Sequence, residues 1–247
     1  MKSLLKLSII ELKLFLRQPA ALFFTLIFPI LLLAVFGAIY GNEPSEFFGG
    51  HGYVDTICPA FIGLVMAMTG FTSIPGAVAA YRERGVLRRL RASPVGASTV
   101  LIAWIIVYTI VTIIGAVLML IFGRIVFGLR FGGTWWLVAI FAVVSMVSLF
   151  ALGFIIASLS PNVRTAETVG MAIYFPMIFL SGATIPVQVF PTTLRKAVQV
   201  LPMTQIVEFM QGLWFGELWT EYLVNLAVIS GLAIVGVIVS ALTFRWE

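Results

Sequence analysis

The sequence predicts an all-α, polytopic membrane protein that forms a single transmembrane domain over residues 1–247. Of the 247 residues, 61% are hydrophobic and only 10% are charged, whereas roughly 25% are charged in a typical soluble domain. A water-soluble fold of this length could not cover so much apolar surface, because its own exterior would be apolar. Six long stretches without Asp, Glu, Lys or Arg also divide the chain. Lipid is therefore the expected solvent for most of its mass.

Six transmembrane helices are expected, because about 20 helical residues cross roughly 30 Å of hydrocarbon. Backbone polar groups in lipid must be satisfied within each segment, and these long runs are unlike the short alternating strands of a barrel. The six charge-free stretches are residues 18–42, 56–81, 92–123, 131–163, 168–194 and 222–244.

The basic residues predict the side of the membrane that each loop faces. Eleven of the 15 Lys and Arg residues precede the first span, follow the last span, or lie in the loops after the second and fourth spans. The other four lie in loops on the opposite side. The positive-inside rule therefore places both termini in the cytoplasm.

Residues 2–17 predict a helix that lies in the cytoplasmic interface instead of crossing the membrane. At about 100° per residue, Lys2, Lys6, Lys13 and Arg17 fall within roughly 60° of one another. Leucine and phenylalanine occupy much of the remaining circumference, which is typical of an interfacial amphipathic helix. A segment that merely flanks the first span and sets its orientation is the alternative.

Residues 186–221 predict broken, re-entrant helices in the outer leaflet, between the fifth and sixth spans. Proline and glycine interrupt the chain after Leu180 and leave two short helical pieces, at about 192–201 and 204–215. Neither piece can cross a bilayer alone, so both should pack against protein instead of lipid. A plain extracellular loop is the alternative, but the aromatic and aliphatic content of this segment argues against it.

Residues that could support catalysis or an ion pathway are few. No ionisable residue lies in the middle of a predicted span, which disfavours a proton pump or a proton-coupled carrier. The single His51 has no catalytic neighbour in sequence, and the single Cys58 excludes an intrachain disulfide and a thiolate metal cluster. The GxxxxGK[ST] phosphate loop does not occur. We therefore expect no catalytic residue, metal site or cofactor in this chain.

An arginine-rich loop, residues 82–95, separates the second and third spans. It holds five arginines within ten residues, more than membrane topology requires. Gly85 is expected to end the second span, and a short helix should follow it until Pro94 ends that helix. A short, rigid, charged helix between two spans suits contact with a cytoplasmic partner. Arginines held by anionic lipid are the alternative.

Two ordered motifs point to a family. The arginine-rich loop reads E-x-G…L-x-A-x-P, and the fifth span and the segment after it contain a succession of Pro, Gly and Glu residues. The residues that carry the motifs are Glu83, Gly85, Leu90, Ala92, Pro94, Phe175, Pro176, Leu180, Ser181, Gly182, Pro186, Pro191, Pro202 and Glu208. Together they resemble ABC type-2 transporter permeases, above all small bacterial multidrug and antibiotic exporter permeases of the daunorubicin-exporter kind. The resemblance covers essentially the whole chain.

The resemblance implies a full transporter of two six-span permease subunits, identical or paralogous, and two separate cytoplasmic ABC ATPase subunits. Its expected function is the export of a lipophilic drug, antibiotic or lipid-like molecule from the cytoplasm or the inner leaflet. ATP and Mg²⁺ would bind to the ATPase subunits, which agrees with the missing phosphate loop. Membrane lipids are further expected partners, nucleic acid is not, and the expected location is the bacterial inner membrane.

The resemblance also assigns candidate site residues. Residues 82–95 would form a coupling segment that carries the movement of the ATPase to the second and third spans. Its candidate contact and turn residues are Glu83, Gly85, Leu87, Arg88, Arg89, Leu90, Arg91 and Pro94. The second and fifth spans line the substrate path in the family, so the candidate liners are Phe61, Met66, Met68, Phe71, Tyr174, Phe175, Met177 and Phe179. Met and aromatic side chains suit a lipophilic substrate of variable shape.

Other functions remain open at this point. A non-transport anchor or scaffold for a cytoplasmic partner would keep the arginine-rich loop without needing a path between subunits. A polysaccharide or lipid exporter subunit is a further alternative, although the small outer loops disfavour a bulky polymer. An intramembrane enzyme lacks the catalytic groups, and a passive channel would conduct without any partner.

Overall fold

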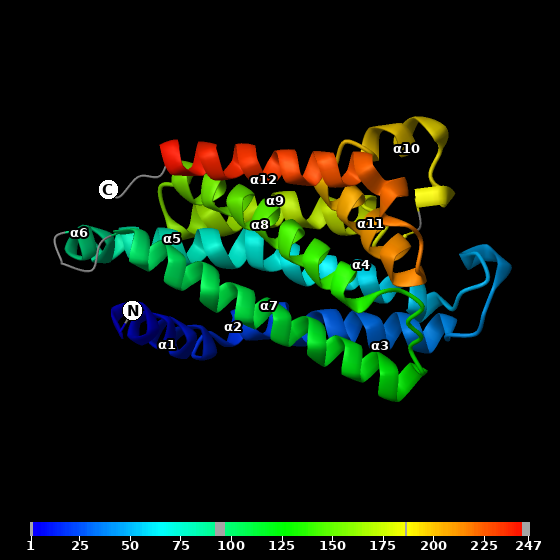
Figure 1. The fold of residues 1–247 in the computed structure, drawn as a ribbon. Coiled ribbons are helices and arrows are strands. Elements are labelled where there is room, and N and C mark those ends of the chain that lie inside the picture. The colour runs from blue at the N-terminus through cyan, green and yellow to red at the C-terminus, as the bar shows by residue number, and fades with distance from the viewer. Residues whose placement is uncertain (1, 92–96, 186, 244–247) are drawn as a thin grey trace.

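Long apolar helices run side by side through most of the molecule. The computed structural model describes residues 2–91, 97–185 and 187–243. Figure 1 shows the long helices as roughly parallel rods, with the connections gathered at the two ends. Within the described residues, five helical segments are long and apolar enough to cross a membrane. They are Pro19–Tyr40, Tyr53–Glu83, Thr99–Phe127, Trp135–Leu159 and Trp219–Thr243.

Twelve α-helices are present in the described part of the chain. They are α1 (Lys2–Leu16), α2 (Pro19–Leu22), α3 (Phe28–Tyr40), α4 (Tyr53–Met68), α5 (Ile74–Glu83), α6 (Val86–Arg91), α7 (Ala97–Phe127), α8 (Trp135–Leu159), α9 (Val163–Leu180), α10 (Thr192–Val198), α11 (Pro202–Phe215) and α12 (Leu223–Thr243). Two π-helical turns, η1 (Phe23–Ile27) and η3 (Thr69–Ser73), join α2 to α3 and α4 to α5. Each of the first two spans is therefore one continuous helical segment with a π-helical turn inside it.

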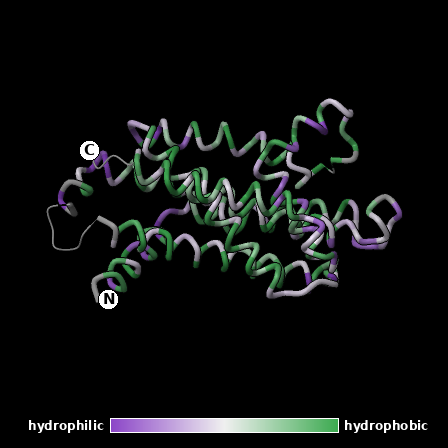
Figure 2. Tube along the Cα trace, turned by 45° about the horizontal axis from the view of Figure 1, so that its top comes forward, coloured by the Kyte–Doolittle hydropathy of each residue, from purple (hydrophilic) through white to green (hydrophobic). Residues whose placement is uncertain are grey.

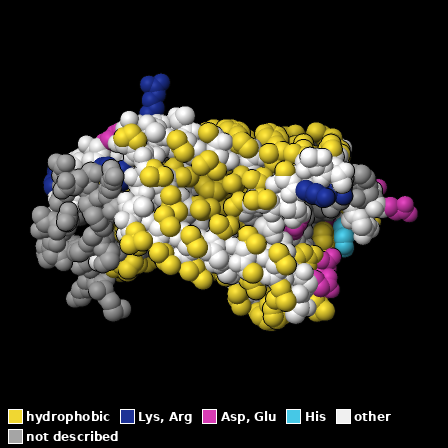
Figure 3. All heavy atoms as spheres, turned by 90° about the horizontal axis from the view of Figure 1, so that it is seen from above, with side chains coloured by type: hydrophobic (Ala, Val, Ile, Leu, Met, Phe, Trp, Pro, Cys, Tyr) yellow, Lys and Arg dark blue, Asp and Glu magenta, His cyan; other side chains and the backbone are white. Residues whose placement is uncertain are grey.

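The second span, α4–η3–α5, is the centre of the protein. Its most apolar window is 94% buried, whereas that of the last span is only 17% buried. Helix α4 contacts α3 and α7 on one side and α8 and α11 on the other. The peripheral helices expose Leu, Ile and Val side chains. In the face drawn in Figure 3, hydrophobic side chains cover the middle and charged side chains lie mostly toward the two ends. Figure 2 shows the same trend along the trace, with hydrophobic residues in the middle and hydrophilic ones mainly toward the ends. This is the surface expected of a protein whose middle lies in hydrocarbon.

The predicted fifth span, residues 168–194, has different bounds in the structure. Helix α9 begins at Val163, because the side chain of Asn162 caps it by accepting a hydrogen bond from the backbone N–H of Thr165 at 2.8 Å. It ends at Leu180, two residues before Gly182, whose φ is +86°. Its first turns include Arg164 and Glu167, which lower the mean hydropathy of α9, and α9 is not one of the five strongly apolar segments.

The segment after α9 forms two short helices close to the predicted ones. Helix α10 lies at the surface, and of its residues only Val198 is buried. Helix α11 is buried against α4, α8 and α12, with Phe209, Leu213 and Trp214 among its buried side chains. Val198, Phe209, Leu213 and Trp214 are therefore packed against protein, whereas Val189, Leu194 and Val200 of the same segment are exposed.

The N-terminal helix α1 is fastened to the spans beside it. It packs along α7, where the rings of Phe15 and Tyr108 meet edge to face with their centroids 6.0 Å apart. Its carboxylate residue, Glu11, is buried and accepts a hydrogen bond from the hydroxyl of Tyr81 near the end of the second span. Helix α1 is thus held by protein contacts in addition to any contact with lipid headgroups.

Acidification should stabilise this attachment. Burial raises the pKa of Glu11 from its ordinary value of 4.5, because loss of water disfavours the charged carboxylate, and the hydrogen bond from Tyr81 only partly opposes this. The resulting stability is fully present below the unfolded pKa and is lost as pH rises through the higher native pKa. We therefore expect the melting temperature to rise from neutral pH into the acidic range.

Glu11→Gln should remove the part of this pH dependence that Glu11 causes, since glutamine keeps an acceptor for Tyr81 but does not titrate. Glu43→Gln is the matched control, because Glu43 is an exposed carboxylate in the loop after α3. If both variants keep the pH profile of the unaltered protein, the assignment to Glu11 is wrong.

Candidate coupling site and substrate path

A glycine turn ends the second span and begins helix α6. Helix α5 ends at Glu83, and Gly85 has φ +64°, a left-handed conformation that glycine adopts without steric cost. The N–H of Gly85 donates to the carbonyl oxygen of Arg82 at 2.9 Å, and Nη2 of Arg89 donates to the carbonyl oxygen of Arg84 at 3.1 Å. Helix α6 lies at the same end of the bundle as α1 and the last turn of α12 (Figure 1).

The coupling residues expected from the sequence have distinct environments. Leu87 is fully buried and holds α6 to the rest of the chain, where α6 contacts α5 and α7. Arg89 is exposed at this end of the molecule. The side chains of Arg88, Leu90 and Arg91, and the whole of Pro94, lie outside the described part of the structure.

Two charged residues at the end of α5 bind the turn between α8 and α9. Nη1 of Arg82 donates to the carbonyl oxygens of Ala157 at 3.0 Å and Ser160 at 2.7 Å, where α8 ends. Oε1 of Glu83 accepts a hydrogen bond of 2.9 Å from the backbone N–H of Val163, the first residue of α9. A cation at a helix C-terminus and an anion at a helix N-terminus both complement the helix dipoles.

We call Arg82 and Glu83 the end clamp of the second span. It connects the end of α5 directly to the end of α8 and the start of α9. The sequence assigned Glu83 to contacts with a partner, whereas in the structure it holds α9 of its own chain. It gave no role to Arg82, whose carbonyl partners lie 75 and 78 positions away in sequence and so leave no local pattern.

The middle of the second span has π-helical geometry, which is frequent at functional sites. Two glycines from neighbouring helices approach η3 very closely. A Cβ atom at Gly153 of α8 would overlap the carbonyl oxygen of Gly70, and one at Gly170 of α9 would overlap that of Phe71. Direct backbone contacts therefore hold α8 and α9 against the π-helical turn.

The candidate path residues divide into a buried and an exposed group. Phe61, Met66, Met68 and Phe71 of the second span, together with Tyr174 and Met177 of α9, are buried in the chain. Phe175 and Phe179 of α9 are 48% and 52% exposed, so they face outward from the single chain. Met66 also lines a cavity of about 680 Å³ that lies between α4, α7, α8 and α11.

The apolar belt, the buried central span and the charged helix α6 at one end define a polytopic membrane protein. Comparison with protein families gives the same class: the model of the ABC-2 type transporter matches residues 3–215. The chain belongs to the ABC-2 type transporter family, and it is a transport permease that associates with an ABC ATPase subunit. A comparison with curated proteins found no match.

Proposed function

We propose that this chain is the membrane subunit of an ATP-driven exporter that moves a lipophilic drug, antibiotic or lipid-like molecule out of the cytoplasm or the inner leaflet. Family membership supports transport with an ABC ATPase. The observation that carries the proposal is helix α6, a short helix containing three arginines that follows the buried central span after the turn at Gly85. Force applied to α6 would reach the middle of the permease through α5.

The proposed assembly contains two permease copies and two ATPase subunits, in a bacterial inner membrane of the kind used by daunorubicin-type exporters. Helix α9 is the fifth of six spans in each permease, α10 and α11 enter the outer leaflet, and both termini are cytoplasmic. The eleven basic residues near one side of the predicted topology support this orientation. The exposed Phe175 and Phe179 of α9 support a path that forms where two permeases meet.

In the proposed mechanism, ATP and Mg²⁺ bind to the ATPase subunits, and closure of the ATPase dimer moves α6. The end clamp carries this movement from α5 to α8 and α9, while Leu87 keeps α6 attached. The two permeases then tilt as rigid bodies and open the path between them outward, as in alternating access. Flexible Met and planar aromatic liners adapt to lipophilic substrates of different shape.

Charge reversal on α6 tests the proposal. The double variant Arg88→Glu and Arg89→Glu should reduce substrate-stimulated ATPase activity and transport on the order of tenfold or more, a typical coupling between distant sites. Membrane insertion should be unchanged, because α6 lies outside the spans. The measurement uses the permease and its ATPase reconstituted together in vesicles.

The matched control reverses the same amount of charge at the same end of the molecule, with Lys6→Glu and Lys13→Glu on the exposed face of α1. This control should keep transport. Full activity of the α6 variant would rule out α6 as the point of coupling. If the unaltered permease binds the ATPase but no lipophilic compound stimulates hydrolysis, the chain is an anchor and not an exporter.

A further inference from the structure

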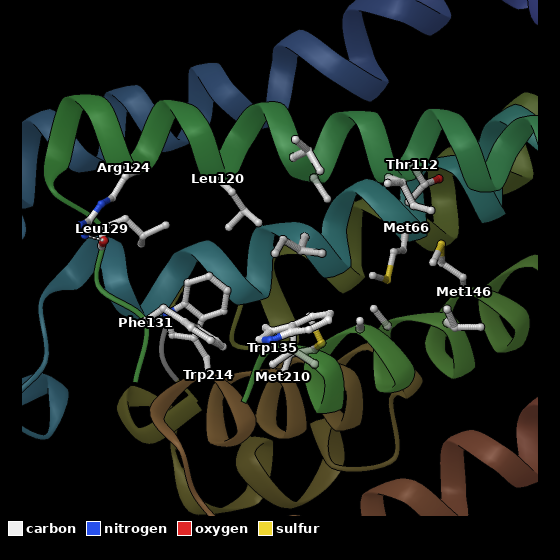
Figure 4. Close-up of a pocket in the computed structure, with 18 residues that line it drawn as sticks. Met66, Thr112, Leu120, Arg124, Leu129, Phe131, Trp135, Met146, Met210 and Trp214 are labelled. Atoms are coloured by element: carbon white, nitrogen blue, oxygen red, sulfur yellow. Dashed lines mark hydrogen bonds between the residues drawn. The ribbon is translucent and has the colours of Figure 1, made fainter. Parts of the chain in front are cut away.

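Helices α7 and α8 follow each other in the chain but hardly touch. Helix α7 packs on α1, α3 and α4, while α8 packs mainly on α12, η3 and α5. The cavity of about 680 Å³ occupies the space between them, and residues of α4 and α11 complete its lining (Figure 4). Its volume is in the range of ~300–1,000 Å³ typical of small-molecule binding sites.

The walls of this cavity are apolar, and its open side lies on the surface that would contact membrane lipid. Ile113 and Val117 of α7 and Trp135 and Val143 of α8 line it, and each also belongs to the exposed surface of the protein. If this space were empty, the side chains of both walls would lose dispersion contacts. The apolar material available there is the acyl chain of a lipid.

The cavity continues along the same pair of helices. A second apolar cavity of about 370 Å³ lies between α7, α8 and α12 and shares Val143 and Met146 with the first. The two together form a track that extends toward the end of the bundle where α6 lies. Its length suits an extended hydrocarbon chain better than a compact drug molecule.

One charged side chain belongs to the described lining of the larger cavity. Arg124 lies near the end of α7, far from α6 and at the end of the cavity that also holds Phe131 (Figure 4). Its Nη1 atom donates to the carbonyl oxygen of Leu129 at 2.7 Å, and it makes no other hydrogen bond or ion pair with the described residues. A guanidinium group has five N–H donors and binds phosphate in a bidentate manner. Arg124 can therefore still bind an oxyanion.

An apolar track with one cation at its membrane–water end is complementary to an anionic phospholipid. We infer that each permease binds such a lipid between α7 and α8, with the phosphate on Arg124 and an acyl chain in the cavity. Trp135 begins α8 beside this end of the cavity, as expected for an aromatic residue at headgroup depth. None of the described residues of α9 lines this site, although the candidate path residue Met66 of α4 does, and the inference does not depend on which substrate is exported.

The bound lipid would also affect the arrangement of the helices. Helix α7 begins directly after the coupling segment, so a lipid that fills the wedge between α7 and α8 sets the tilt of the helix that α6 adjoins. Loss of the lipid would let the two helices close on each other or splay.

Native mass spectrometry of the purified permease tests the headgroup contact. Phosphatidylglycerol and phosphatidylcholine with identical acyl chains are offered in competition, and the unaltered protein should retain phosphatidylglycerol preferentially. Arg124→Gln should reduce this preference about fivefold, the equivalent of the ~1 kcal/mol that one basic side chain contributes beside anionic lipid. Arg124→Lys should keep most of the preference.

Arg130→Gln is the matched control, because Arg130 lies at the same end of the molecule but does not line the cavity, and its backbone N–H supplies the 2.7 Å bond to Asp55. It should keep the full preference. An unchanged preference in Arg124→Gln, or an equal loss in Arg130→Gln, would overturn the assignment of the phosphate to Arg124.

Acyl-chain photolabelling tests the cavity independently of the headgroup. Phosphatidylglycerol with a diazirine on its chain should label α7 and α8, and Ala139→Trp, which projects into the cavity from an exposed position on α8, should reduce that labelling severalfold. Labelling that is unaffected by Ala139→Trp would overturn the lipid site. So would an efficient disulfide between two permease copies at Val117→Cys, because a second copy of the chain would then cover the cavity.

Discussion

Gly153→Val should prevent the permease from accumulating in a folded form. A Cβ atom at this position would overlap the carbonyl oxygen of Gly70, and both partners are backbone, so neither can rotate out of the way. Helix α8 would have to separate from η3, which costs more than the ~1–3 kcal/mol typical of overpacking with flexible side chains. Close backbone approach is also what allows membrane helices to associate. The measurement is the yield of monodisperse protein after extraction, together with its melting temperature.

Gly231→Val provides the matched control for that experiment. Gly231 also lies inside a transmembrane helix, but a Cβ atom there meets nothing within 4 Å. Its variant should accumulate like the unaltered protein. Equal yields of the two variants would show that α8 and η3 are not held by this backbone contact.

Arg82→Met should abolish coupling between ATP hydrolysis and transport. The variant removes two hydrogen bonds from a charged group, each worth ~1.5–3 kcal/mol, and leaves the carbonyl oxygens of Ala157 and Ser160 without their donor. Movement of α5 would then no longer reach the end of α8. We expect ATP-dependent substrate uptake into inverted vesicles to fall at least tenfold, while the ATPase still binds.

Arg84→Met separates this effect from a general loss of positive charge. Arg84 is exposed in the same turn, and its backbone oxygen, which the substitution keeps, accepts the hydrogen bond from Arg89. Transport should therefore be close to normal. If the Arg82 and Arg84 variants transport equally well, the end clamp has no part in coupling.

Composition was sufficient to predict those spans whose two ends lie near the two ends of a charge-free run of residues. Helices α3, α7, α8 and α12 occur where such runs occur, because helical backbone is the state that satisfies its own polar groups in lipid. Helix α9 shows the limit of this approach. Asn162 and Gly182 determine its ends through capping and turn geometry, and neither effect depends on charge.

The candidate site was predictable only where its signal is local. The turn at Gly85 could be predicted from the sequence, because few residues other than glycine adopt this left-handed backbone conformation at low cost. Burial on α9 could not be predicted in this way. Tyr174 is buried and the adjacent Phe175 is exposed, although both are large and aromatic. In an apolar helix, hydropathy does not distinguish the protein-facing side from the lipid-facing side, so only packing reveals it. The resemblance to ABC-2 permeases, in contrast, is confirmed by the family model over residues 3–215.

The wedge between α7 and α8 divides the protein into two bodies. Helices α1, α3 and α7 form one, and α8, α9, α11 and α12 form the other, with α4 in contact with both. If the two bodies tilt against each other in the proposed cycle, the thickness of hydrocarbon that the protein must match changes, at a cost of fractions of a kcal/mol per Å. We therefore expect the rate of the proposed ATP-driven cycle to change with the acyl-chain length and stiffness of the host membrane.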